Sequence, residues 1–185
     1  MKRVQKLIVL RCVAIAVFAT PAIVAAQTST TAPPPPPSCA SDPAFHVLDF
    51  WVGSWTVVDS TGANVGTNRI EKILDGCAVT ELWHEPNGDE GRSLFYYVPA
   101  QRQWKQVWIT PAARAPGGLK EKFLLHADAK SVRFQGEIIG QRGAIILDRT
   151  TLSRVADGRV RQQIEISRDG GTSWEMTFDA TYIRR

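Results

Sequence analysis

The chain has 185 residues, a length typical of one domain. It carries 22 Lys and Arg against 18 Asp and Glu, but residues 1–26 hold four of the basic residues and no acidic ones. The remainder balances at 18 (22 − 4) against 18. A domain without net charge offers no basic surface for nucleic acid or for an anionic membrane, so neither partner is expected.

Residues 1–26 have the order of a secretory signal peptide. Basic residues come first, an apolar run follows at 13–18, and small residues precede a cleavage site after Ala26. A retained transmembrane anchor is the alternative, but the apolar run is short for a span and Pro21 follows it. We therefore expect a periplasmic or secreted protein with no membrane span after signal cleavage.

Residues 27–38 predict an extended linker, since they are polar and include five consecutive prolines. The folded domain is expected to cover residues 39–185. Cleavage of the signal peptide would leave two cysteines, and an even count in an exported protein is typical of a disulfide. We predict a bond between Cys39 and Cys77; two separate thiols are the alternative.

One short N-terminal helix is expected within residues 41–48, with Ser41 or Asp42 as its cap and Pro43 in its first turn. From residue 54 onward strands alternate with turns, and Asp75-Gly76 is a strong hairpin signal. The expected strands are 54–60, 67–74, 77–84, 92–98, 103–110, 119–126, 131–139, 144–154, 159–168 and 173–184.

This spacing leaves no room for crossover helices, so successive strands should pair antiparallel. The expected fold class is all-β: a single antiparallel up-and-down β-barrel of about ten strands. An open sandwich is the alternative, and closure is favoured because it removes exposed strand edges. In a closed barrel the first and last strands are neighbours. We expect Trp55 to contact Arg184 there, with the guanidinium stacked on the indole.

The segment Asp49-Phe50-Trp51-x-Gly53-x-Trp55 contains the Gly-x-Trp pattern of lipocalin-type barrels. Further motifs follow in order: Asp75-Gly76-Cys77, Glu81-x-Trp83, Gly91-x-Ser93, Trp104-x-Gln106-x-Trp108, Ser167-x-Asp169-Gly170-Gly171-x-x-Trp174 and Tyr182-x-Arg184. With them the chain resembles, over residues 45–185, an uncharacterised family of secreted bacterial lipocalin-like (calycin-type) β-barrel proteins. The resemblance implies a barrel and export, and no activity. The long helix before the last strand of true lipocalins is missing from the pattern.

Three features invite a catalytic or metal-binding interpretation and are better explained as structure. Residues 167–174 resemble the Asp-box hairpin of sialidases, but one copy cannot form a propeller, so Asp169 is interpreted as tying a turn. The three histidines lack HxH or HxxxH spacing, so no metal or other cofactor is expected. Ser93 lacks a Gly-x-Ser-x-Gly elbow, and no catalytic residue is assigned.

Polar residues alternate with aromatic ones on the expected strands 77–84, 92–98 and 103–110. Because side chains alternate along a strand, each of these strands presents its aromatic and polar residues on one face. If those faces turn inward, the lumen has the composition of a small-molecule pocket. A filled core or a solvated outer face is the alternative, since a slip of one residue turns a strand over. The predicted ligand-binding residues are Glu81, Trp83, Ser93, Tyr97, Gln106 and Trp108.

The sequence is consistent with three classes of function. We expect an exported barrel that binds a small apolar or aromatic ligand in its lumen. The second class is an enzyme on the same barrel, with a buried Glu81 or Glu165 as acid or base. The third is a structural or envelope interaction module that uses the proline-rich linker as a spacer. An unfilled lumen favours the first, and a filled core with an exposed apolar patch favours the third.

The signal-peptide assignment predicts that the exported protein begins at Gln27. Amino-terminal sequencing or intact mass of protein recovered from the periplasm or medium of an expressing bacterium checks this. Exported material that still begins at Met1 would contradict the assignment.

Overall fold

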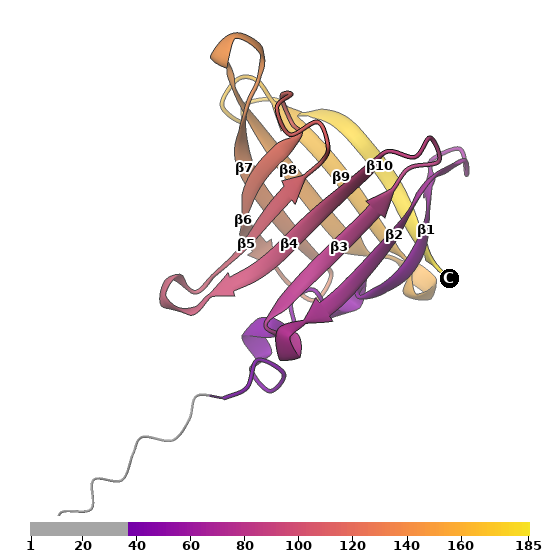
Figure 1. Ribbon diagram of the computed structural model, residues 1–185, viewed down its shortest axis with the longest axis vertical. Coiled ribbons are helices and arrows are strands. Elements are labelled where there is room, and N and C mark those ends of the chain that lie inside the picture. The colour runs from indigo at the N-terminus through magenta and orange to yellow at the C-terminus, as the bar shows by residue number, and fades with distance from the viewer. Residues whose placement is uncertain (1–36) are drawn as a thin grey trace, which may run out of the picture. The chain divides into compact units, whose positions relative to one another are not determined.

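The computed structural model describes residues 37–185, so the expected signal peptide and nearly all of the expected linker lie outside the described residues. The described chain forms a closed antiparallel barrel of ten strands, which confirms the all-β fold class (Figure 1). The strands are β1 (Gly53–Asp59), β2 (Asn64–Ile73), β3 (Ala78–His84), β4 (Glu90–Val98), β5 (Gln103–Ile109), β6 (Leu119–Ala127), β7 (Ser131–Ile139), β8 (Ile145–Arg154), β9 (Val160–Ser167) and β10 (Glu175–Arg184).

Each strand pairs with its neighbours in sequence, and β1 pairs with β10 to close the barrel. At that seam Trp55 lies directly opposite Arg184. The guanidinium carbon of Arg184 lies 4.5 Å from the centroid of the Trp55 ring. Gly53 makes room for this contact, because a Cβ there would lie 2.5 Å from Nη1 of Arg184. Burial of the indole and its stacking on the guanidinium therefore help to join the first strand to the last.

The short helix expected within residues 41–48 is present as one turn of 3₁₀ helix, η1 (Pro43–Phe45), and a second 3₁₀ turn, η2 (Asp49–Trp51), follows outside that range. Asp42 caps η1, since its carboxylate accepts a hydrogen bond of 2.9 Å from the N–H of Ala44. The buried residues explain the form: Phe45, Leu48 and Trp51 recur every three positions, which is the period of a 3₁₀ helix.

Four more 3₁₀ turns lie in the connections between strands. They are η3 (Leu74–Gly76), η4 (Pro99–Gln101), η5 (Gln141–Gly143) and η6 (Ala156–Gly158). In η3 the backbone of Asp75 is left-handed, with φ at 54°, and Gly76 follows at 87°. The Asp-Gly pair expected to mark a tight connection therefore does so between β2 and β3.

The segment that carries η1 and η2 fills one end of the barrel, called here the closed end. Trp51 packs edge-on against Phe95 and Tyr182, with ring centroids 5.6 Å and 6.0 Å away. Two hydrogen bonds fasten the segment: Nε1 of Trp55 donates to the carbonyl of Trp51 at 2.8 Å, and Nε1 of Trp104 donates to the carbonyl of Ala44 at 2.7 Å. The closed end is therefore a packed apolar core, and the opposite end is called the open end.

The disulfide between Cys39 and Cys77 is confirmed. It joins the chain just before η1 to the residue just before β3, so it ties the closing segment to the barrel wall. The two cysteines are 38 residues apart in sequence. Cross-linking a loop of that length restricts the unfolded chain strongly.

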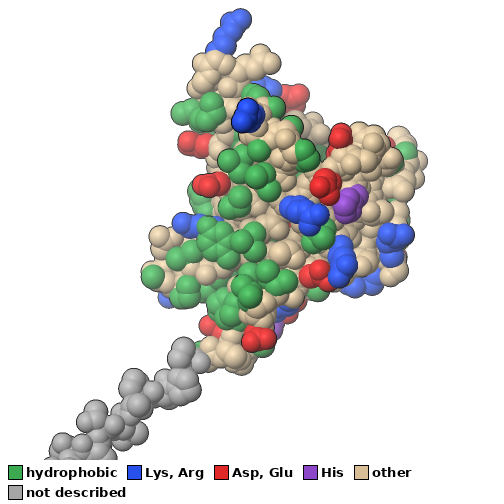
Figure 2. All heavy atoms as spheres, viewed as in Figure 1, with side chains coloured by type: hydrophobic (Ala, Val, Ile, Leu, Met, Phe, Trp, Pro, Cys, Tyr) green, Lys and Arg blue, Asp and Glu red, His purple; other side chains and the backbone are tan. Residues whose placement is uncertain are grey.

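The outer surface carries an apolar patch. Figure 2 shows apolar side chains gathered over β4 to β6. The exposed large apolar residues on these strands are Leu94, Ile109, Leu119, Phe123 and Leu125. Within the part of the chain that the structure describes, no helix has the length and apolar character needed to cross a membrane.

Replacing both cysteines, Cys39→Ser with Cys77→Ser, should lower the free energy of unfolding by about 4 kcal/mol, because the unfolded chain regains the entropy of the closed loop. Urea unfolding of the oxidised wild type and the double variant measures the difference. A variant as stable as the wild type would show that the bond adds nothing to the barrel.

Candidate functional site

A cavity of about 180 Å³ lies in the open half of the lumen. It begins above a layer of buried polar side chains, and the closed-end core lies below that layer. The residues that line the cavity come from six strands or their ends and are Glu81, Trp83, Glu85, Gln106, Trp108, Lys120, Lys122, Thr150, Gln162, Ile164, Phe178 and Tyr182. The walls are therefore mainly aromatic and aliphatic toward the open end, and the floor is polar.

Two tryptophans form one wall of the cavity, and glycines on neighbouring strands make room for them. A Cβ on Gly91 would lie 2.1 Å from Cη2 of Trp108, and a Cβ on Gly66 would lie 2.5 Å from Cη2 of Trp83. Each indole therefore lies against the backbone of the adjacent strand instead of filling the centre of the lumen. Phe178 completes this wall, with its ring centroid 6.1 Å from that of Trp83 in an edge-on arrangement.

Glu81 lies at the centre of the polar floor and is almost fully buried. Its Oε1 accepts a hydrogen bond of 2.7 Å from Asn68, and its Oε2 accepts one of 2.6 Å from Ser93. Both donors are neutral. Burial raises the pKa of Glu81, and the two hydrogen bonds together with the positive charge of Lys122 offset that effect only in part.

The hydrogen bonds extend from Glu81 in both directions around the barrel. On one side Nε2 of Gln106 donates to Oγ of Ser93 at 3.1 Å. On the other side Nδ2 of Asn68 also donates to the hydroxyl of Tyr182 at 3.2 Å, and that hydroxyl donates to the amide oxygen of Gln162. We call this connected set the polar belt; its members, in order, are Gln162, Tyr182, Asn68, Glu81, Ser93 and Gln106. Burial raises the pKa of Tyr182 well above its usual range, so its hydroxyl stays a donor.

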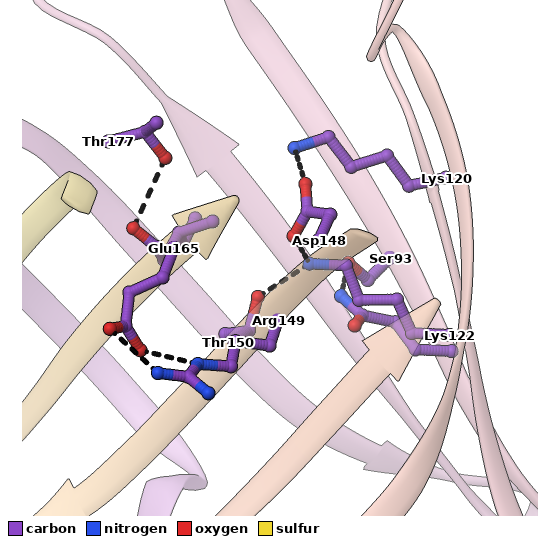
Figure 3. Close-up of polar contacts among 10 residues, drawn as sticks. Ser93, Lys120, Lys122, Asp148, Arg149, Thr150, Glu165 and Thr177 are labelled. Carbon is purple, nitrogen blue, oxygen red and sulfur yellow. Dashed lines mark hydrogen bonds and ion pairs between the residues drawn. The ribbon is translucent and has the colours of Figure 1, made fainter. Parts of the chain in front are cut away.

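A second polar group continues the floor on the opposite side of the barrel (Figure 3). Lys120 and Lys122 of β6 both bind the carboxylate of Asp148 on β8; the bond from Lys120 is 2.7 Å long, and Lys122 also donates to Oγ1 of Thr150 at 2.7 Å. Between these strands, β7 presents Gly136 opposite Asp148. A Cβ at Gly136 would lie 1.9 Å from a backbone oxygen of β6, so only glycine allows this close approach.

Burial and neighbouring charges act on this group in opposite directions. Burial lowers the pKa of Lys122 to about 8, because the attraction of Asp148 offsets the loss of water only in part and Lys120 adds to the lowering. Burial also opposes ionisation of Asp148, but the two ammonium groups outweigh it and lower the pKa of that carboxyl. At neutral pH the group therefore holds two cations and one anion.

One buried acceptor on the cavity lining has no partner. Oε1 of Gln106 makes no hydrogen bond, and the residue is 7% exposed. Among the described residues, the other buried side-chain polar atoms without a partner are Oδ1 of Asn68 and Nε1 of Trp51, and neither residue lines the cavity. A buried acceptor without a donor is costly, so Gln106 marks the place where the hydrogen bonding of the polar belt is incomplete.

Of the six residues predicted for a site, four line the cavity: Glu81, Trp83, Gln106 and Trp108. Ser93 lies behind the lining, where it connects Glu81 to Gln106. The placement of Tyr97 in this site is wrong. Tyr97 lies two inward positions beyond Ser93 on β4. This places it at the closed end, where its ring centroid is 5.2 Å from that of Phe45.

The expectation that Glu165 supplies a buried carboxylate is also wrong. Glu165 faces away from the lumen and binds Arg149 in a bidentate ion pair, with distances of 2.7 Å and 2.9 Å (Figure 3). The same guanidinium lies 3.7 Å from the centroid of the Trp174 ring. Arg149 lowers the pKa of Glu165, and the ion pair links β8 to β9 on the outer surface of the barrel.

The sequence prediction did not include the part of the lining that comes from β6 and β8 to β10. These residues are Lys120, Lys122, Thr150, Gln162, Ile164, Phe178 and Tyr182. A signal was present in the alternation of lysines at 120 and 122 with Leu124 on one strand face, and of Asp148 with Thr150 on another. Because lysine is rarely buried, the pattern on residues 120–124 is typical of a solvent-exposed strand face.

Within residues 167–174, Asp169 accepts hydrogen bonds from the backbone N–H of Ser173 at 2.9 Å and from Oγ of Ser167 at 2.8 Å. The segment is thus a tied turn between β9 and β10. In residues 37–185 no three His, Cys, Asp or Glu side chains are grouped so that they could hold a metal ion.

A scan of the chain against protein-family models gives no match, and a comparison with curated protein sequences gives none either. The chemistry of the site therefore has to be argued from its own residues.

Glu81→Gln should flatten the pH dependence of stability. The folded-state pKa of Glu81 lies above its ordinary value of 4.5, so its contribution is fully present below that value and is lost as the pH rises through the raised pKa. The wild-type free energy of unfolding should fall relative to that of the variant as the pH rises from about 5 to about 8. Urea unfolding at several pH values measures both curves.

Glu165→Gln is the matched control. Arg149 lowers the pKa of Glu165, so the contribution of that carboxylate is lost only as the pH falls into the acid range. The control should keep the wild-type slope above about pH 5. Parallel curves for the wild type and Glu81→Gln over the same range would show that Glu81 titrates as an ordinary carboxyl.

Proposed function

We propose that the protein binds a small aromatic or apolar molecule in the open half of its lumen. The observation that carries the proposal is the cavity of about 180 Å³ itself, which is walled by two indoles and a phenyl ring above a polar floor. Indole and phenyl walls supply apolar area at about 25 cal/mol per Å² buried. The floor supplies orientation, because a polar group of the ligand placed there can bind the polar side chains that line it.

The size of the cavity limits the ligand. Apolar cavities of about 150 Å³ take up single aromatic rings. A cavity of about 180 Å³ therefore suits a ligand of one ring or two fused rings, and is too small to enclose a long-chain lipid. The polar belt forms the floor. Any polar group of the ligand would therefore point down toward Glu81, Lys122 and Gln106, and the ring would lie above it, nearer the open end.

Catalysis by Glu81 is the competing function, and its burial and raised pKa are the observations in its favour. The hydrogen bonding supports a structural role instead. Each carboxylate oxygen accepts a hydrogen bond, from Asn68 at 2.7 Å and from Ser93 at 2.6 Å, and both donors belong to the polar belt. We therefore assign Glu81 to positioning Ser93 and, through it, Gln106.

Export to the periplasm or the medium is part of the same proposal. The disulfide between Cys39 and Cys77 is typical of proteins that fold in an oxidising compartment. A barrel and export are also what the resemblance to the uncharacterised family of secreted lipocalin-like proteins implies, and membership of that family belongs to the proposal as well.

Calorimetric titration with 2-naphthalenemethanol, a neutral two-ring probe, tests the binding site. The wild type should bind it, and Ile164→Trp should reduce the affinity by at least about tenfold, because the larger side chain fills the cavity. Ile183→Trp makes the same change on the exposed outer face of β10 and should bind as the wild type does.

Circular dichroism spectra establish that both variants are folded. Binding that survives in folded Ile164→Trp would place the site elsewhere. No binding by the wild type to this probe or to charged probes with the same ring would contradict the proposed function as a whole.

A further inference from the structure

We propose that the ligand is an aromatic anion, a carboxylate or a group of similar charge, whose head group binds Lys120 and Lys122. This assignment rests on the proposed function, because it names the chemical class of the molecule that the cavity takes. Two observations support the assignment: the two lysines have N–H donors that no described residue uses, and the carboxylates around them do not balance their charge.

The two ammonium groups have donors to spare. Each lysine has three N–H donors. Lys122 uses two of them, on Asp148 and Thr150, and Lys120 uses one, on Asp148. Three N–H groups therefore have no partner among the described residues, and both lysines line the cavity. A carboxylate has oxygen lone pairs enough to accept from both ammonium groups at once.

The charge balance also favours an anion. On the floor of the cavity Asp148 neutralises one of the two ammonium groups and leaves one positive charge. Glu81 faces the same cavity, but its partners are the neutral Asn68 and Ser93 instead of a cation. Its raised pKa favours the protonated form relative to an ordinary glutamate, and an incoming anion would favour that form further.

Glu85 is the remaining charged residue on the lining, and it lies at the mouth. It is exposed, and its carboxylate accepts a hydrogen bond of 3.3 Å from Nε1 of Trp83. Solvent screens its charge, whereas Lys122 and Asp148 are buried on the floor. The field inside the cavity therefore comes mainly from the lysine group, and it attracts anions and repels cations.

Sequence and fold together place these lysines in the lumen. Lys120 and Lys122 alternate with outward-facing residues along β6, and Gly136 on β7 lets them reach Asp148 on β8. Lysine is seldom buried without a reason, because its ammonium group loses water. A single lysine would be enough to neutralise Asp148, so the second is the excess that a ligand anion can use.

Three probes with one ring system and different charges test the class of ligand: 2-naphthoate, 2-naphthalenemethanol and 2-naphthylmethylammonium. Calorimetric titration of the full exported protein at pH 7 should give an affinity for the anion at least about tenfold above that for the alcohol, and the weakest affinity for the cation. Equal affinities for the anion and the alcohol would overturn the proposal while leaving ring binding intact.

Lys120→Met isolates the second charge and leaves the Lys122–Asp148 pair in place. It should weaken binding of 2-naphthoate by about tenfold and change binding of the alcohol by less than about twofold. Lys120→Arg, which keeps the charge, should retain most of the preference. Lys105→Met removes a lysine from β5 at a position that alternates with the inward Trp104 and Gln106, and it should bind all three probes as the wild type does.

Two results would overturn the proposal. One is a wild-type preference for the anion that folded Lys120→Met keeps in full, since the charge would then come from elsewhere. The other is tightest binding of the ammonium probe, which would make a carboxylate the head-group partner. If none of the three probes binds, the proposed function itself fails, and the two failures are therefore distinguishable.

Discussion

The buried carboxyl of Glu81 sets the organisation of the lumen. A carboxyl at that depth has to be hydrogen-bonded, and its partners Asn68 and Ser93 recruit partners of their own. The resulting polar belt runs from Gln162 on β9 to Gln106 on β5 and joins strands that are far apart in sequence. It also divides the interior, because an apolar core can form below it, whereas closing the space above it would bury polar groups without partners.

Below the belt, the chain fills the barrel with residues that precede the first strand. Phe45, Leu48 and Trp51 enter from the segment that carries the two 3₁₀ helices, and the disulfide holds the start of this segment against β3. Above the belt, inward positions on three strands are glycines: Gly66, Gly91 and Gly136. Two of them let an indole lie against the wall, and the third lets β6 and β7 approach closely. The cavity is therefore built by small residues at fixed positions and by large residues placed beside them.

The sequence was sufficient for the number of strands and their order, because turn residues separate segments of alternating polarity and a meander has few ways to pair. It was also sufficient for the lining on β3 and β5, since only β4 lies between the strand of Glu81 and the strand of Gln106 and Trp108. Tyr97 was misplaced because alternation gives the face of a residue and leaves open its depth along the barrel. Glu165 was misassigned because nothing local distinguishes an outward glutamate with an arginine partner from an inward one.

The lysine group could not be found in the same way. Lys120 and Asp148 lie 28 residues apart, and their contact depends on Gly136 between them as well as on the closure of the barrel. Long-range contacts of this kind follow from register, which a one-residue slip would invert. Hence the residues that give the cavity its charge come from strands on which no alternation of aromatic and polar residues marks the inward face.

One half of the lumen is packed, and we propose that the other half receives a ligand. Nuclear magnetic resonance of the ¹⁵N-labelled indole groups tests it directly, since the chain has six tryptophans and each reports on its own surroundings. During titration with 2-naphthoate, the Nε1–H signals of Trp83 and Trp108 should shift. The signals that should stay in place belong to the closed end and the outer surface: Trp51, Trp55, Trp104 and Trp174. Shifts confined to that second set would contradict the claim.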